Sequence, residues 1–226
     1  HDKLNALDVG SAGGFNSSGD FNNKYNQYFK SILIEPNTDE VKLKKKYYKA
    51  LWSEECLKEF YILENKNASS FYEPDIENFK IAYKKNPILV NQFRVSEVVQ
   101  AECDTISNVL NEKSIKVLDY LTIITQGSEF EILKGMKNFQ PLLIKVQAFI
   151  FPLYKNLPCW TKLVDFLYSK NYILISSEDI GQQVTQEPFQ KYMIFIPNFT
   201  NKSGTSSILK RENKFIFLLI IFGQIE

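Results

Sequence analysis

Short runs of β-forming residues alternate with helical segments along this chain, and that alternation is the strongest constraint on its fold. Such a pattern predicts an α/β domain with a central, mostly parallel sheet flanked by helices. The predicted strands are Ala6–Val9, Ser31–Ile34, Glu59–Leu63, Val95–Gln100, Asp119–Thr125, Leu142–Phe149, Tyr172–Ser176, Tyr192–Ile196 and Phe215–Phe222. The predicted helices are Thr38–Lys46, Thr105–Glu112, Glu129–Lys134 and Cys159–Lys170.

Length and hydropathy favour one domain over residues 1–226. Of the 226 residues, 44% are hydrophobic, and no internal repeat or second apolar unit divides them. The longest apolar run, Phe215–Phe222, is far shorter than the roughly 20 residues that a membrane-spanning helix needs. We therefore expect no membrane span. Because the chain starts without Met, close to its first strand, we also expect it to be truncated at the N-terminus.

Charge and residue counts exclude several functions. The 27 basic and 26 acidic residues leave no positive excess for nucleic-acid binding. The single histidine is His1, which excludes a histidine triad or a His-ligated metal site inside the domain. The cysteines, Cys56, Cys103 and Cys159, are odd in number and form no C-x-x-C pair. This pattern predicts reduced, mostly buried thiols of a cytoplasmic chain.

Two local patterns make more specific predictions about secondary structure. Ser128 and Glu131 stand three residues apart and predict a capping box at the start of a helix. Gly135 stands where a glycine would end the same helix. The polar segment Asn198–Ser207 is rich in Gly, Ser and Thr and predicts a long loop.

The strongest functional signal is the run L-D-V-G-S-A-G-G at Leu7–Gly14, where a predicted strand ends in glycines. Without a Cβ, the backbone there can come very close to a ligand. The spacing G-x-x-G-G differs from the G-x-G-x-x-G of dinucleotide sites, which disfavours a nicotinamide-dependent oxidoreductase. Asp8, before the first glycine, suits a ligand that carries a cationic ammonium group.

A second buried strand ends in an acid, Glu35, shortly after the glycine run. An acid at the end of the second strand of such a sheet can accept hydrogen bonds from both hydroxyls of a ribose. The alternative interpretation is a glycine turn and an unrelated surface glutamate. The two signals together favour a nucleoside-containing ligand.

Further segments follow in a consistent order up to about Ile175. They are D-V-G-S-A-G-G at Asp8–Gly14, I-E-P at Ile34–Pro36, Y-Y-K-A-L at Tyr47–Leu51, F-Y-I at Phe60–Ile62 with A-S-S-F-Y at Ala68–Tyr72, Asp104 before a helix, T-Q-G-S-E-F-E-I-L-K-G at Thr125–Gly135, and F-P-L-Y-K-N at Phe151–Asn156. This set resembles the FkbM-type S-adenosylmethionine-dependent methyltransferases. The resemblance implies a Rossmann-like class I methyltransferase fold, S-adenosylmethionine as cofactor, and methyl transfer to a hydroxyl of a sugar-like, glycan or other small acceptor.

The resemblance also implies roles for individual residues. By this analogy, cofactor binding falls to Asp8, Gly10, Ser11, Gly13, Glu35 and Asp104. The residues expected where methyl group and acceptor meet are Ser69, Ser70, Gln126 and Glu129, the last three as catalytic candidates. No metal is implied.

One stretch departs from the family pattern. Where the family reads L-K-I-D-T-Q-G, residues 121–127 read L-T-I-I-T-Q-G, so that Thr122 and Ile124 replace a lysine and an aspartate. An acid at the end of that strand would face the ligand crevice of an open α/β sheet. The loss of the acid fits an inactive relative, a changed acceptor or a sequence error. Two functions stay open: an active methyltransferase, and a non-catalytic module that keeps the fold and the cofactor site.

Overall fold

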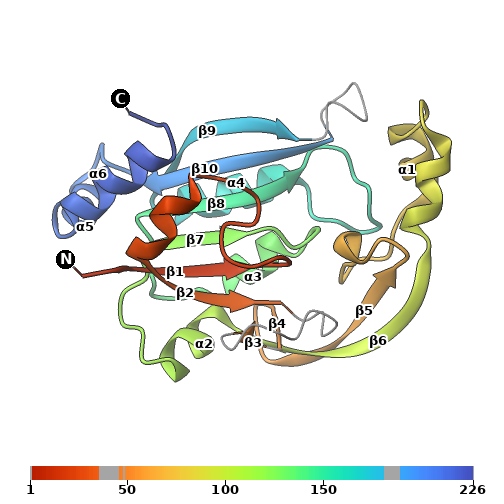
Figure 1. The fold of residues 1–226 in the computed structure, drawn as a ribbon, viewed down its shortest axis with the longest axis horizontal. Helices are drawn as coiled ribbons and strands as arrows, with labels where there is room; N and C mark the ends of the chain where they lie inside the picture. The colour runs from red at the N-terminus through yellow and green to blue at the C-terminus, as the bar shows by residue number, and fades with distance from the viewer. Residues whose placement is uncertain (1, 36–45, 48, 181–188, 226) are drawn as a thin grey trace.

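Seven strands form the central sheet of the computed structural model, which describes residues 2–35, 46–47, 49–180 and 189–225. In spatial order they are β3 (Lys46–Tyr47), β2 (Phe29–Ile34), β1 (Leu4–Val9), β7 (Tyr120–Ile123), β8 (Leu143–Phe149), β10 (Gln190–Pro197) and β9 (Tyr172–Ile180). A second sheet has the order β4 (Ala50–Leu51), β6 (Val95–Asp104) and β5 (Cys56–Leu63). Its two long strands curve away from the central sheet (Figure 1).

The central sheet is mostly parallel. Strand β1 pairs in parallel with β2 and β7, β7 with β8, and β2 with β3. Among the described strands of this sheet, β10 alone runs antiparallel to both of its neighbours, β8 and β9. The predicted α/β architecture with a mostly parallel sheet is therefore confirmed.

The strand order reverses between β1 and β7. From β1 the chain moves outward to β2 and β3, and later returns to place β7 on the other side of β1 before continuing to β8. In open α/β sheets, ligands bind beyond the carboxyl ends of the strands at such a reversal. The ends of β1 and β7 are therefore the expected position of a ligand site.

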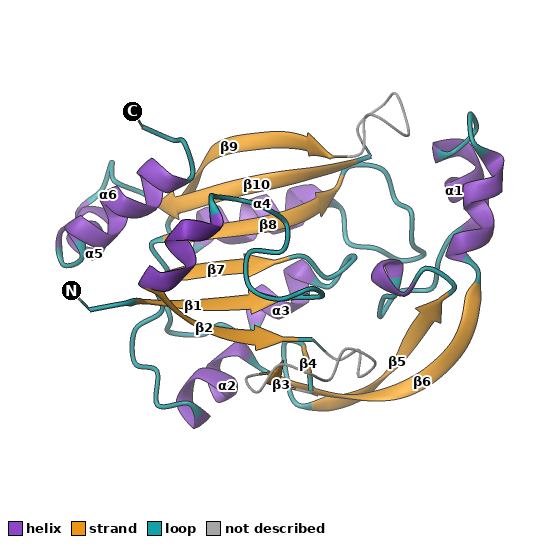
Figure 2. Cartoon of the chain, in the orientation of Figure 1, coloured by secondary structure: helices purple, strands orange, loops and turns teal. Residues whose placement is uncertain are grey.

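Strand residues alternate between two cores. One core packs Leu7, Ile123 and Val146 against α2 (Ile106–Glu112), α3 (Glu129–Lys134) and α4 (Trp160–Ser169). Figure 2 shows α3 and α4 behind the sheet. The other core packs Ala6, Tyr120 and Leu143 against Phe21 and Leu218. Because side chains alternate along a strand, Asp8 lies on the same face as Ala6, two residues before it.

A third cluster lies at the end of β5 in the second sheet. It joins α1 (Ile76–Ala82) and the 3₁₀ helix Pro87–Phe93 to the segment that follows β8. The rings of Phe79 and Phe93 stack with centroids 4.0 Å apart, and the Tyr154 hydroxyl donates to the Ala68 carbonyl at 2.7 Å. This packing holds β5 and the turn that follows it close to the end of the central sheet.

Two predictions near the C-terminus are wrong. Residues Phe215–Phe222 belong to helix α6 (Glu212–Ile221) and its end, and not to a strand. An apolar run of eight residues does not distinguish a buried strand from a buried helix by periodicity. Within the segment predicted as a loop, Asn201 caps helix α5 (Lys202–Leu209) by accepting from the Gly204 amide at 3.0 Å.

The predicted capping box is also wrong. The Ser128 hydroxyl makes no capping hydrogen bond, and Glu131 instead accepts from Lys134 at 2.8 Å. Gly135 is in the right-handed region, with φ −75°, so it does not form a left-handed helix end. A Cβ there would lie 2.5 Å from the Trp52 carbonyl oxygen, so close packing requires this glycine.

Other predictions need smaller adjustments. The predicted helix Thr38–Lys46 lies outside the described residues, except Lys46, which is in β3. Helix α1 has no counterpart among the predicted elements. Cys103 is buried as predicted, but Cys56 is half-buried and Cys159 is exposed. Over the part of the chain that the structure describes, no helix is long and apolar enough to cross a membrane.

The C-terminal helix provides a test of the fold. Leu218 is fully buried and Ile220, two residues later, is 51% exposed, a separation that a helix produces and a strand does not. We expect Leu218→Ala to lower the free energy of unfolding by about 2–5 kcal/mol, because it leaves a cavity. Ile220→Ala should change it by less than about 1 kcal/mol. Urea denaturation measures both changes, and equal losses of unfolding free energy for the two variants would contradict the helix.

Candidate functional site

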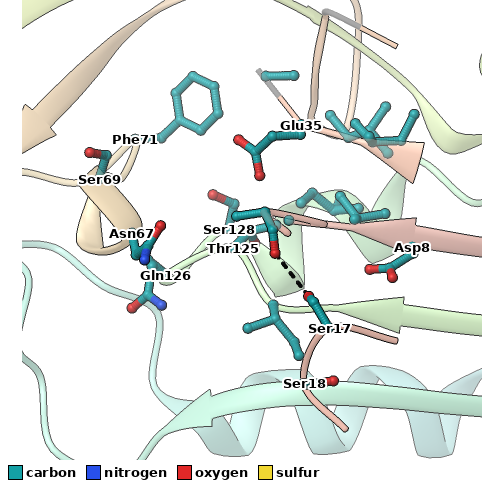
Figure 3. A pocket seen from close by; sticks show the side chains of 18 of the residues that line it. Asp8, Ser17, Ser18, Glu35, Asn67, Ser69, Phe71, Thr125, Gln126 and Ser128 are labelled. Carbon is teal, nitrogen blue, oxygen red and sulfur yellow. Dashed lines mark hydrogen bonds between the residues drawn. The ribbon is translucent and has the colours of Figure 1, made fainter. Parts of the chain in front are cut away.

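A cavity of about 300 Å³ lies at the carboxyl ends of β1, β2 and β7 (Figure 3). Its walls come from the turn after β1, the end of β2, the loop 124–128 after β7, and the segment 60–71 of the second sheet. The volume is at the lower end of the range for small-molecule pockets. The cavity therefore occupies the position at which the strand order predicts a ligand.

Five of the residues predicted to bind the cofactor or to lie near the acceptor line this cavity. They are Asp8, Gly10, Glu35, Ser69 and Gln126. In Figure 3, Ser69 and Gln126 lie on one side of the cavity and Asp8 lies on the other. The structure therefore brings the acid of the glycine run and the acid after the second strand to one space.

Asp8 is a buried carboxylate on the ligand side of the sheet. Only 6% of its surface is exposed, and its Oδ2 accepts from the Asn16 amide at 3.4 Å. Burial raises the pKa of Asp8 to about 7, and the negative charges of Asp20 and Glu35 act in the same direction. A cationic ligand group beside Asp8 would favour its ionised form.

A buried ion pair lies near Asp8. The ammonium group of Lys145, on β8, pairs with the Asp20 carboxylate, which also accepts from the Tyr120 hydroxyl at 3.1 Å. The same ammonium group lies 3.9 Å from the centroid of the Tyr192 ring. Lys145 is therefore enclosed by an acid and an aromatic ring, and its charge lowers the pKa of Asp8.

Position 10 requires glycine for two reasons, its backbone conformation and its close contact with the backbone at the end of β7. Its φ is +83°, and a Cβ at this position would lie 1.9 Å from the Ile124 carbonyl oxygen. Its amide donates to the Ile34 carbonyl at 2.9 Å. This residue therefore brings together the ends of β1, β2 and β7, and no other residue type fits.

Glu129 and Ser70 shape the loop after β7 from behind. The Glu129 carboxylate accepts from the amides of Thr125 at 2.8 Å and Gly127 at 3.0 Å. The Ser70 hydroxyl donates to the Gln126 carbonyl at 2.7 Å. Gln126 has φ +59°, a left-handed conformation that these flanking contacts hold. Neither Glu129 nor Ser70 lines the cavity, so their contacts are those of positioning residues.

The other three predicted cofactor residues are also outside the cavity wall. Ser11 is buried, and its hydroxyl lies 3.4 Å from the Ile34 carbonyl. Gly13 continues the glycine turn with φ +89°. Asp104 accepts from the Thr105 amide at 2.7 Å, next to the start of α2. These residues support the segments around the site.

Sequence reasoning missed several residues of the cavity wall. Phe60, Asn67 and Phe71 come from the second sheet and the turn after it, and Tyr192 comes from β10. The segments F-Y-I and A-S-S-F-Y are a signal for the two phenylalanines, because both segments belong to the family resemblance. Nothing in the sequence indicates Tyr192, because only the fold brings β10 next to this site.

The departure from the family pattern has a structural context. Thr122 on β7 pairs directly with Asp8 on one side and with Lys145 on the other. A lysine is therefore present in the same row of the sheet, one strand away from the position where the pattern has it. Ile124 lines the cavity, so the missing aspartate leaves an apolar side chain in the wall.

The strand reversal, the glycine turn and two acids facing one cavity define an α/β protein with a ligand site at the ends of its parallel strands. A family model described as Methyltransferase FkbM domain matches residues 8–174. The chain belongs to this family. No curated protein and no solved structure matched the chain. Within the described ranges, no group of three or more His, Cys, Asp or Glu side chains could hold a metal ion.

The Gly10 contact predicts a large difference between two glycine substitutions. Gly19 also has a positive φ, +72°, but a Cβ added there would meet no atom within 4 Å. Gly19→Ala should therefore cost only the conformational term, about 1–2 kcal/mol of unfolding free energy. Gly10→Ala should cost roughly 1–3 kcal/mol more, because it also forces β1 and β7 apart. Chemical denaturation measures both, and equal costs would contradict the close contact.

The loop after β7 predicts different roles for two neighbouring glutamates. Glu129→Gln replaces one of the two accepting oxygens with an NH2 group that faces a backbone N–H, which should cost about 1–3 kcal/mol of unfolding free energy. Glu131→Gln removes only a surface pair with Lys134 and should cost less than about 1 kcal/mol. Urea denaturation measures both losses. A larger loss for Glu131→Gln than for Glu129→Gln would indicate that Glu131 caps the helix.

Proposed function

We propose that this chain is an S-adenosylmethionine-dependent methyltransferase with a Rossmann-like class I fold, acting on a hydroxyl of a sugar-like or other small polar acceptor. The observation that carries the proposal is the placement of two buried acids, Asp8 and Glu35, around one cavity next to a glycine without a Cβ. Family membership supports methyl transfer as the class of reaction.

The cavity residues fit the chemical groups of this cofactor. The Asp8 carboxylate suits an ammonium group, since the positive charge would offset the cost of its burial. Glu35, at the end of β2, suits the two hydroxyls of a ribose. Leu51, Phe71 and Ile132 supply apolar surface for a purine ring. The bare backbone at Gly10 leaves room for the ligand to approach closely.

The cofactor supplies a methyl group already activated by a positively charged sulfur. The chain's own contribution would then be to hold an acceptor oxygen in line, which can supply roughly 7–11 kcal/mol. Asn67, Ser69 and Gln126 offer amide and hydroxyl groups on the wall opposite Asp8, and these suit an acceptor with several hydroxyls (Figure 3). General-base help would add a smaller factor, typically about 10²–10⁴.

A non-catalytic module is the second candidate, and one observation favours it. Ile124 places an apolar side chain in the wall where the family pattern has an acid. The Thr122 difference is weaker support, because Lys145 supplies a cation in the same row of the sheet. The evidence for the non-catalytic module therefore comes down to one residue, Ile124, and a substitution there can separate the two candidate functions.

Calorimetry with S-adenosylmethionine, its demethylated product and NAD tests the cofactor. We expect the two sulfur compounds to bind and NAD not to bind. Failure of both sulfur compounds would refute the proposal, and binding of NAD alone would favour an oxidoreductase. Methyl transfer to a panel of sugars then separates enzyme from module. If binding occurs without turnover, Ile124→Asp should restore transfer where the missing acid is the defect.

The raised pKa of Asp8 predicts how cofactor affinity depends on pH. With a pKa of about 7, Asp8 is mostly protonated at pH 6 and mostly ionised at pH 8. Because the ammonium group prefers the ionised form, affinity should rise roughly tenfold over that range. Asp8→Asn should weaken binding and remove the rise. The exposed Asp165 provides the control, since Asp165→Asn should keep the rise. A flat profile in the unmodified protein would exclude Asp8 as the ammonium partner.

A further inference from the structure

Two cysteines far apart in the sequence lie opposite each other in the second sheet. Cys56 on β5 and Cys103 on β6 are direct register partners in an antiparallel pair. Directly opposed residues in such a pair have Cα atoms roughly 4.5–5.5 Å apart. Disulfides need a Cα separation of about 4.4–6.8 Å, so the backbone already meets that requirement.

The two side chains also point the same way. Over residues 56–60 of β5 and 99–103 of β6, half-buried or buried positions alternate with exposed ones, and Cys56 and Cys103 are both on the inner face. The Cys103 thiol donates to the Ala101 carbonyl at 3.7 Å. Burial, and secondly the neighbouring Cys56, raise the pKa of Cys103 to about 12. The strand register and the shared face therefore place the two side chains where a disulfide can form.

The two thiols differ in access. Cys103 is 3% exposed and packs against Ala50 and Trp52, whereas Cys56 is half-buried at the start of its strand. Lys58, two residues after Cys56 on the same face, places its ammonium group 4.4 Å from the centroid of the Trp52 ring. Cys56 is therefore the thiol that an external reagent reaches first.

We propose that Cys56 and Cys103 form a dithiol that is reversibly oxidised to a disulfide by a small-molecule disulfide such as oxidised glutathione. The Cys56 thiolate attacks the reagent, forming a mixed disulfide and releasing one glutathione thiolate. The Cys103 thiol then loses its proton and attacks the Cys56 sulfur, forming the intramolecular bond and releasing the second glutathione. In net terms, two protein thiols are oxidised and one glutathione disulfide is reduced to two thiols.

The site lies directly behind the wall of the candidate pocket. Ala50 pairs with Cys103 across the second sheet and also lines the cavity. Trp52 contacts Phe71, another wall residue, with ring centroids 5.3 Å apart. The proposal goes beyond the proposed methyltransferase activity and does not depend on it, since it requires only the two opposed strands.

The experiment treats the native, reduced protein with oxidised glutathione, traps free thiols by alkylation in denaturant, and maps the peptides. The chain has three cysteines, and the third, Cys159, is exposed at the start of α4, outside the second sheet. We expect one intramolecular Cys56–Cys103 disulfide, reversed by excess reduced glutathione. Cys159→Ser, the matched control, should form the same disulfide.

Cys56→Ser, at the half-exposed position, should leave Cys103 alkylatable after the same treatment. In the unmodified protein the oxidised form should melt roughly 4–16 °C higher than the reduced form. Glutathione that stays on Cys56 without a cross-link would overturn the proposal, as would modification confined to Cys159. An oxidised form that melts no higher than the reduced one would also overturn it. That result would show that the disulfide strains the folded protein, and that the fold does not place the two cysteines for bond formation.

Discussion

The contact at Gly10 is the constraint on which the rest of the site depends. Its amide bonds the end of β2 and its α-carbon lies against the backbone at the end of β7, so three strand ends converge on one residue without a side chain. Convergence of the strand ends creates the cavity, and it also places Asp8 and Glu35 at the same space. A side chain at this position would separate the strands and open the wall that Ile124 forms.

A buried ion pair partly compensates the negative charge that is buried beside the cavity. Asp8 and Asp20 are two acids on the ligand face, and Lys145 supplies the buried cation that pairs with Asp20. Burial raises the pKa of Asp8, and because Lys145 pairs with Asp20, Asp8 retains a cost of ionisation that a cationic ligand would offset. The site is therefore arranged so that its own ion pair leaves one acid available.

The pattern of short strands was enough to predict the central sheet, because strands buried on both faces read as short apolar runs with turn residues between them. The same reasoning failed for Phe215–Phe222, since an apolar run with no periodicity fits either element, and contacts of Arg211 and Lys214 with the buried Asp119 decide for a helix. Gly135 shows a related limit. The sequence places a glycine at the end of α3, but the structure requires glycine there because of close packing against Trp52, and not because of a left-handed helix end.

Sequence alone determined the glycine turn, the acids at the ends of the first two strands and the family, because these features are local in the chain and need few neighbours to be read. Only the tertiary contacts show which of the predicted site residues line the cavity. They also show which ones hold the loop after β7 without lining it, as Glu129 and Ser70 do. It also decided that Lys145 lies beside Thr122 and that Cys56 lies opposite Cys103. Those pairings depend on strand register between distant segments, which no local pattern encodes.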